Sequence, residues 1–399
     1  MNHGIYITEI ETGIIAPSEG YCGLPVMIGT SGKGPYNEPV LVHTYAEAVD
    51  AFGYDDNWYK TDGNWSEHTI SEFIYTQFVL YGQGPAVIIR GTFPSQKGII
   101  GGYDAQTGQT TGLELVDHVY HKFGIVPGII LSPYFSRDPV ITAVMRAKAE
   151  SISGQFKCIC LTDVSADACK KYTDVPAWKS ANNYSSIREI TCWPRVKLGD
   201  KKFHLSTHLC GVMNRTDNAH SDVPYKSPSN ESLQIDSCVN ESGDEVMLTH
   251  DEANYLNDQG IITALNWAGD WRTWGNRTSI YPRSTDVKDS VISVRRMFDY
   301  IGNTFINTMW QKTDQPMTVR LIRETVNSFN LYLNGLTARE MILGGRIEFR
   351  EDENPRTSIA AGKLTFHLYI TPPMPAESIE GILEYDAENL DILYDAVRG

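Results

Sequence analysis

The chain has 399 residues, of which 41% are hydrophobic and 21% are charged, and its formal net charge is −15. This length exceeds one ordinary core, so two or three domains are expected. The acidic balance argues against nucleic acid as the main partner, because phosphate binding needs an excess of Lys and Arg. No apolar run reaches the length of about 18 residues that a membrane-spanning helix needs, so no membrane partner is expected.

The N-terminus has neither the basic start nor the apolar core of a secretion signal. The seven cysteines show no paired CxxC framework, so a chain kept reduced in the cytoplasm is the simplest interpretation. Residues 3–10 predict a strand with alternating β-branched and aromatic side chains. Its apolar members are Ile5, Tyr6, Ile7 and Ile10. The turn at residues 17–20 sets this strand apart, so it is either an edge strand of its own domain or an arm.

The next stretch alternates between strands and helices. Strands are predicted at 23–30, 39–42 and 85–90, and helices at 44–52 and from Ser66 onward. Thr44 and Glu47 have the spacing of a capping box at the start of the first helix. The segment 55–65 is polar, aromatic and loop-like.

A glycine-rich stretch at 94–111 precedes a second pattern of the same kind. Helices are predicted at 113–123, 139–151 and 167–172, and strands at 128–131, 157–161 and 189–192. Alternation of this kind predicts a mixed α/β fold. Residues 214–250 are polar and rich in Ser, Asn and Asp, which predicts a long surface loop.

The C-terminal part is predicted to be helical first and extended later. A helix runs from Val287 to about Trp310, and another opens at Pro316. A hairpin is predicted from 346–350 and 364–370. The alternation in 378–386 predicts a last strand, and a short helix carrying Leu390, Leu393, Tyr394 and Val397 follows it.

Three tryptophans stand within eight residues of one another: Trp267, Trp271 and Trp274. They precede a turn formed by Gly275, Asn276, Arg277 and Thr278. Tryptophan is large and its N–H needs a partner when it is buried. This cluster is therefore interpreted as core or domain junction, with a subunit contact as the alternative.

Residues that could carry chemistry are sparse. Gly98, Gly101 and Gly102 lack the spacing of a phosphate-binding loop, so a domain-boundary loop is the preferred interpretation. His118 and His121 share one predicted helix, and Cys158 and Cys160 share one predicted strand, but no second ligand pair at zinc spacing accompanies them. No nucleophile-elbow or metalloprotease motif is present, so neither an enzyme nor a cofactor is expected.

The tryptophan stretch also carries a resemblance to a known family. The series Leu256-Asn257, Gly260-Ile261-Ile262-Thr263 and Trp271 to Thr278 resembles the signature of contractile tail sheath proteins of phages and R-type pyocins. Further motifs occur in the family's order across roughly residues 85–395. They are Thr111-Gly112-Leu113, Pro127 to Pro133, Thr191 to Pro194, Pro316 to Val319 with Ile322-Arg323, Ala361 to Leu364, and Pro372 to Pro375.

The resemblance implies a structural protein that stacks as hexameric rings around a tail tube in a virion tail and contracts to drive the tube through a cell envelope. It implies a multidomain arrangement: an N-terminal arm at 1–22, an inner domain from 23–98 and 283–376, an inserted outer α/β domain at 99–282, and a C-terminal arm at 377–399. Its partners would be further copies of itself, the tail tube protein, and the baseplate and tail terminator proteins.

In this family the terminal strands pair with neighbouring subunits. The resemblance therefore assigns Ile5, Tyr6, Ile7 and Ile10, together with Ile379, Leu383 and Tyr385, to inter-subunit strands. It also implies that Arg320 and Arg323 face the tube, with a solvated helix face as the alternative. The alternatives for the whole chain are an α/β enzyme of unknown chemistry, or the sheath of another contractile injection system.

Overall fold

The computed structural model describes residues 23–59, 65–92 and 94–393 of the chain. The predicted N-terminal strand with Ile5, Tyr6, Ile7 and Ile10 lies outside these residues, as do Tyr394 and Val397. The described part is a mixed α/β protein built on one eight-stranded sheet and several smaller sheets.

The main sheet holds six parallel strands flanked by one antiparallel strand at each edge. In spatial order the strands are β13 (Asp270–Trp274), β12 (Ile261–Trp267), β8 (Glu189–Cys192), β7 (Ile159–Asp163), β6 (Ile129–Leu131), β1 (Pro25–Gly29), β3 (Ala86–Arg90) and β2 (Pro39–Val42). The central strands are buried along their whole length, as expected of parallel strands covered on both faces.

Alternate side chains of each strand enter two different cores. On β1, Met27 belongs to the first core, and Val26 and Ile28 belong to the second core on the opposite face of the sheet. The helices of the first face are α1 (Tyr45–Phe52), α2 (Thr69–Ile74) with its π-helical continuation η2 (Tyr75–Leu80), and α7 (Leu205–Asn218). Those of the second face are α3 (Gln96–Ile100), α4 (Val116–Phe123) and α5 (Pro139–Glu150).

Smaller elements surround this body. A three-stranded sheet is formed by β10 (Lys201–Phe203), β9 (Arg195–Leu198) and β11 (Ser237–Val239), and a hairpin by β4 (Gly102–Asp104) and β5 (Gln109–Thr111). Helices α6 (Val175–Ala181) and α8 (His250–Asn257) enclose a third core beside β12. Short 3-10 turns are η1 (Trp65–Glu67), η3 (Gly112–Leu115), η4 (Phe135–Arg137), η5 (Tyr172–Asp174), η6 (Trp310–Lys312) and η7 (Ala387–Leu390).

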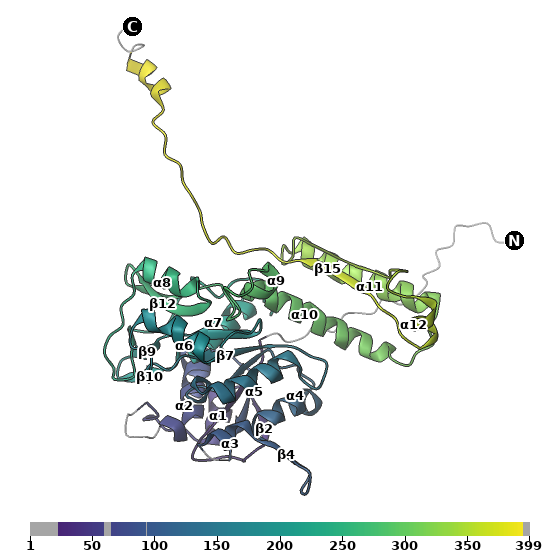
Figure 1. The fold of residues 1–399 in the computed structure, drawn as a ribbon, viewed down its shortest axis with the longest axis horizontal. Coiled ribbons are helices and arrows are strands. Elements are labelled where there is room, and N and C mark those ends of the chain that lie inside the picture. The colour runs from purple at the N-terminus through teal and green to yellow at the C-terminus, as the bar shows by residue number, and fades with distance from the viewer. Residues whose placement is uncertain (1–22, 60–64, 93, 394–399) are drawn as a thin grey trace, which may run out of the picture.

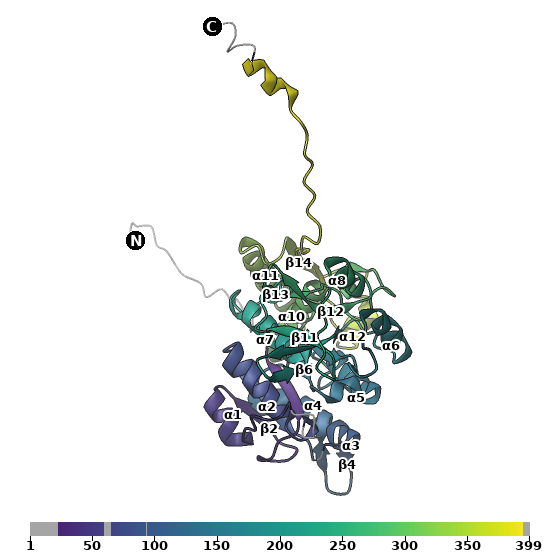
Figure 2. The same cartoon turned by 90° about the vertical axis from the view of Figure 1, so that its left-hand side faces the viewer.

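The C-terminal part forms a separate layer with its own core. Its elements are α9 (Val287–Ser290), α10 (Ile292–Met309), α11 (Val319–Ala338), β14 (Gly344–Glu348), α12 (Arg356–Ala360) and β15 (His367–Thr371). Phe329, Leu333 and Leu336 of α11 pack against Tyr300 of α10 and Ile347 of β14. Figures 1 and 2 show this layer on the side of the body opposite to α3 and β4.

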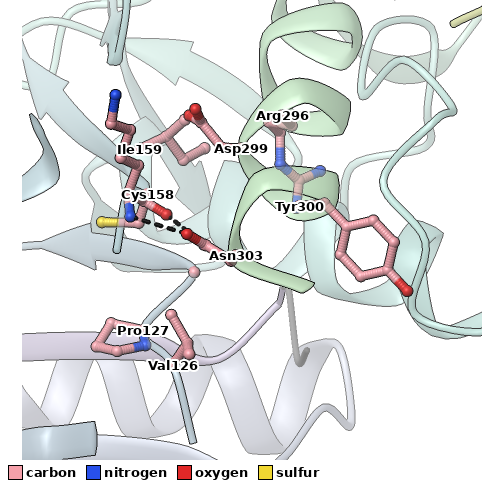
Figure 3. A pocket seen from close by; sticks show the side chains of 10 residues that line it. Val126, Pro127, Cys158, Ile159, Arg296, Asp299, Tyr300 and Asn303 are labelled. Carbon is pink, nitrogen blue, oxygen red and sulfur yellow. Dashed lines mark hydrogen bonds between the residues drawn. The ribbon is translucent and has the colours of Figure 1, made fainter. Parts of the chain in front are cut away.

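Helix α10 is attached to the body by polar contacts. Asp299 accepts hydrogen bonds from Arg188 at 3.0 and 2.9 Å, and Arg296 forms a buried ion pair with Asp217. Figure 3 shows the narrow crevice between α10 and the residues that lead into β6 and β7, which has room for about one water molecule (10 Å³).

Several predicted elements need correction. The helix predicted at 167–172 is wrong, because the helical segment begins with η5 at Tyr172 and continues into α6. The surface loop predicted at 214–250 is also wrong, because this stretch contains the end of α7, all of β11 and the buried side chains of Leu233 and Ile235. In the predicted loop 55–65, Trp58 is fully buried. The strand predicted at 378–386 is not formed in the isolated chain.

The domain division stays a prediction. Strands β1, β2 and β3 come from residues 23–98, whereas β6, β7, β8, β12 and β13 come from 99–282, and all of them share one sheet.

Candidate assembly surfaces

The three tryptophans lie on the hairpin of β12 and β13 and serve different purposes. Trp271 is buried in the first core, and its Nε1 donates to the Asp236 carbonyl at 2.9 Å. Trp274 packs beside α8, and its Nε1 donates to Asn254 Oδ1 at 2.8 Å. Trp267 pairs across the hairpin with Asp270 and is 63% exposed. Two of the three therefore join elements, and the third lies at the surface.

The turn after β13 is a meeting point of four segments. Gly275 has φ 129°, and a Cβ there would lie 2.7 Å from Ile262 Cδ1, so glycine is required. The N–H of Asn276 donates to Asn257 Oδ1 at 3.0 Å, and its carbonyl accepts from the Ile292 N–H at 2.9 Å. The Ser227 hydroxyl donates to Asn276 Oδ1.

Arg277 connects this turn with the C-terminal segment. Its Nη2 donates to Glu377 Oε2 at 2.6 Å, and its guanidinium lies 4.9 Å from the centre of the Tyr281 ring. No sequence pattern predicts the role of Glu377, because a single acidic residue 100 positions from its partner carries no local signal. The pair fixes the point where the C-terminal segment leaves the body.

The C-terminal segment extends away from the body (Figures 1 and 2). Ile379, Leu383 and Tyr385 are 88%, 99% and 78% exposed. No helix or strand is present in 372–386. This leaves an apolar segment without a partner in the described part of the chain.

The two-stranded sheet of β14 and β15 is a second element that lacks a partner within the described residues. Its strands pair with each other in antiparallel register from Gly344↔Thr371 to Glu348↔His367. Neither outer edge has a strand partner within residues 23–59, 65–92 and 94–393. Two strands alone are marginally stable in water, although α11 supports this pair from one side.

Helix α11 presents an exposed face that carries the two predicted arginines. Arg320 forms an i,i+4 ion pair with Glu324 at 2.6 Å, and this hydrogen bond lowers the pKa of the Glu324 carboxyl. Arg323 is exposed one turn away on the same face, as is Leu331, which is 56% exposed. The structure therefore places both arginines on one accessible surface but gives the first of them a partner of its own.

The glycine-rich stretch and the His and Cys pairs, considered above as possible binding sites, have the geometry of structural residues. Gly101 has φ 70°, and a Cβ there would lie 1.9 Å from the Thr111 carbonyl oxygen, so the glycines allow the close approach of two segments. His118 and His121 are exposed on α4, whereas Cys158 and Cys160 are buried. Among the described residues no group of three His, Cys, Asp or Glu side chains could hold a metal ion. Within the same residues, no helix combines the length and apolar character needed to span a bilayer.

Comparison with known proteins agrees with this geometry. No family model matches the sequence. The chain is 24% identical to a putative prophage major tail sheath protein of Pseudomonas aeruginosa (strain UCBPP-PA14), over 94% of each chain. It is 23% identical to the tail sheath protein of Escherichia phage P2, over 95% of this chain and 94% of that protein.

The chain belongs to the contractile tail sheath proteins of phages, prophages and contractile injection systems. Its fold matches the sheath of an extracellular contractile injection system in the contracted state, with a TM-score of 0.70, 14% identity and coverage of 98% of this chain and 99% of that one. A chain of the anti-feeding prophage baseplate gives a TM-score of 0.70 at 17% identity, with 97% and 99% coverage. This is a structural family, so the alternative of an α/β enzyme is set aside.

Proposed function

We propose that this tail sheath subunit polymerises as hexameric rings around a tail tube, and that the assembled sheath contracts to drive the tube through a cell envelope. The partners would be further copies of the chain, the tube protein, and the baseplate and tail terminator proteins. The particle is a phage tail or a related contractile injection system.

The exposed C-terminal segment is the observation that carries this proposal. Exposing Ile379, Leu383 and Tyr385 to water is unfavourable by roughly 25 cal/mol for each Å² of apolar surface, so the segment gains stability when it is covered. A strand added to an open sheet edge gains backbone hydrogen bonds and places alternate side chains in fixed register. The edges of β14 and β15 offer such a site on a neighbouring copy.

Paired arms also suit a contracting lattice. Contraction requires subunits to rotate and slide past one another as rigid bodies while they remain connected. An extended segment tied to its own body by Arg277 and Glu377, and to a neighbour by strand pairing, would provide this connection. The extended sheath would be a metastable state that releases interaction free energy when the baseplate triggers it.

We also propose that α10, α11, β14 and β15, within the predicted inner domain 283–376, lie toward the tube, and that the outer domain lies within 99–282. Because strands from 23–98 and 99–282 share one sheet, these two stretches are expected to move together. The Asn276 turn and Trp271 would transmit that movement across the junction.

The substitution Leu383→Pro tests the arm. Proline removes a ladder donor and fixes φ, so strand pairing with a neighbour should fail. The melting temperature of the subunit should be unchanged because Leu383 is 99% exposed. Negative-stain microscopy should show rods or rings for the wild type and for Leu383→Val, and dispersed particles for the proline variant. Deletion of residues 1–14 is predicted to act in the same way. Normal rods from Leu383→Pro would refute the arm.

A further inference from the structure

A second cavity lies away from the junction and the terminal segments. It opens between α6 and residues 279–283 and has a volume of about 190 Å³. Helix α6 lies at the margin of the molecule in Figure 2. The residues that line the cavity include several with polar groups: Lys179, Ser180, Ser185, Gln259, Tyr281 and Arg283.

Lys179 lines this cavity and is only 6% exposed. Its Nζ donates to the carbonyls of Gln259 and Tyr281, at 2.5 and 3.0 Å. An ammonium group has three N–H donors, so one of them lacks an acceptor in the described part of the chain. Both acceptors are neutral carbonyls, which leaves the charge itself uncompensated by direct contact.

The carboxylate that acts on Lys179 is that of Glu189, which also faces another cation. Glu189 is fully buried, and Arg146 Nη1 lies 3.6 Å from its Oε2. Glu189 acts on Lys179 only from beyond ion-pair distance. Glu189 thus acts on two cations, and the residues that line the cavity include Lys179 and Arg283 but no Asp or Glu, in a chain of net charge −15.

Arg283 adds a second cation at the rim. It is exposed, its Nη1 donates to Ser185 Oγ at 3.1 Å, and its charge is close enough to lower the pKa of Lys179. Burial is the larger cause, and the pKa of Lys179 falls from 10.5 to about 8. Two like charges facing one cavity repel each other unless an anion lies between them.

We propose that this cavity binds a small oxyanion, a carboxylate or a phosphate, between the ammonium of Lys179 and the guanidinium of Arg283. Charged donors make the strongest hydrogen bonds to such groups, and the guanidinium can bind one through two parallel N–H donors. Ser180 at the mouth supplies a further hydroxyl. The oxyanion is either free in solution or a Glu or Asp side chain of a second copy.

Binding can be measured on the purified full-length subunit. Sodium phosphate and sodium citrate should each raise the melting temperature saturably relative to sodium chloride at equal ionic strength, since a ligand of the folded state stabilises it. Calorimetry should show an affinity that weakens as the pH rises from 7 to 9, because Lys179 loses its proton in that range.

The decisive variant is Arg283→Gln, because this exposed side chain can be changed without disturbing the fold. Its affinity for both anions should fall at least tenfold, whereas its melting temperature without anion should match the wild type. Arg339→Gln, an exposed arginine at the end of α11, is the matched control and should bind as the wild type does. Equal binding by Arg283→Gln, or no saturable effect of either anion, would overturn the site.

The protein concentration needed for polymerisation distinguishes a free oxyanion from a carboxylate of a second copy. If a neighbouring carboxylate occupies the cavity, phosphate should raise the protein concentration needed for rods, and Arg283→Gln should raise it as well. If the oxyanion is free, phosphate should bind the subunit and the rods alike without changing that concentration.

Discussion

Asn303 of α10 bonds to both backbone groups of Lys157, two residues before β7 begins. Its Nδ2 donates to the Lys157 carbonyl at 2.7 Å, and its Oδ1 accepts from the Lys157 N–H at 3.1 Å (Figure 3). The side chain thus imitates a strand neighbour at the margin of the main sheet. It joins the C-terminal layer to the body, together with the Asp299–Arg188 and Arg296–Asp217 contacts.

Loss of this double bond should loosen the layer. Asn303→Ala is expected to lower the free energy of unfolding by about 1 kcal/mol, the usual net contribution of such bonds when water can replace them. Urea denaturation measures the change. Asn327→Ala, an exposed site on α11, should stay within about 0.5 kcal/mol of the wild type. Equal stability of the two variants would show that Asn303 does not hold α10 in place.

Two substitutions in the segment 214–250 test whether its buried side chains belong to the core of the protein. Leu233 is 5% exposed and belongs to the first core, whereas Met247 is 70% exposed. Leu233→Ala should lower the free energy of unfolding by about 2–5 kcal/mol, because it removes buried methyl groups and leaves a cavity. Met247→Ala should change it by less than about 0.5 kcal/mol. A mild effect of Leu233→Ala in thermal denaturation would restore the surface-loop interpretation.

Because His208 is buried, the free energy of unfolding is expected to fall in acid. Burial lowers its pKa from 6.5 to about 3, and its Nδ1 lies 3.0 Å from the Tyr81 hydroxyl oxygen. Between these pH values the unfolded chain binds a proton that the folded chain does not. Stability from this group is therefore complete above pH 6.5 and falls as the pH drops toward 3, by up to about 1.4 kcal/mol per pH unit.

The variant His208→Gln removes this titration. Its free energy of unfolding, measured at pH 4, 5, 6 and 7, should depend less steeply on pH than that of the wild type. His118→Gln is the matched control because His118 is exposed on α4, and it should keep the wild-type slope. Identical slopes for His208→Gln and the wild type would contradict the prediction.

Local signals predicted much of the fold. The strands β1 and β3 are short apolar runs bounded by turn residues, and both were expected within two residues of their bounds. Thr44 caps α1 as its spacing with Glu47 predicts, since its hydroxyl accepts from the Glu47 N–H at 3.2 Å. These elements depend on interactions between near neighbours in the chain, which the sequence shows directly.

Helix α7 shows what the sequence could not reveal. Its polar side chains are buried on almost every face, so it has no amphipathic pattern to find. Its first residues bond to distant carboxylates: the His204 N–H donates to Glu72 Oε1 at 2.6 Å, and the Ser206 N–H donates to Asp163 Oδ1 at 3.1 Å. A polar sequence of this kind becomes a core element only when its partners are brought to it.

The candidate assembly residues show the same division. The tryptophan cluster was predicted from composition alone, but the pairing of β12 with β13 decides that Trp271 points inward and Trp267 does not. The alternation around Leu383 predicted a strand that the structure does not form, and in the proposed assembly the pairing partner of that strand would lie on another subunit. Pattern predicts which segments can pair, and tertiary or quaternary contacts decide whether they do.

The exposed face of α11 gives a graded test of tube contact. Arg320 is already paired with Glu324, whereas Arg323 has no ion pair among the described residues. If this face meets an acidic tube, Arg323→Glu should reduce tube loading more than Arg320→Glu. The reason is that Arg320 is already paired with Glu324, so its substitution mainly removes that local pair. The double variant should give empty sheath but few extended sheaths on tubes.

The expected effect is small for each subunit and large for the particle. An exposed ion pair contributes about 0.2–1 kcal/mol, and repetition around every ring multiplies this contribution through avidity. Raising the salt concentration should reproduce part of the loss, because charges at the surface are screened beyond roughly 8–10 Å. Cosedimentation of purified tubes with each variant measures loading, and Arg339→Gln serves as the control for a change of charge on α11's far end. Normal loading of the double variant at all salt concentrations would mean that this face of α11 points away from the tube.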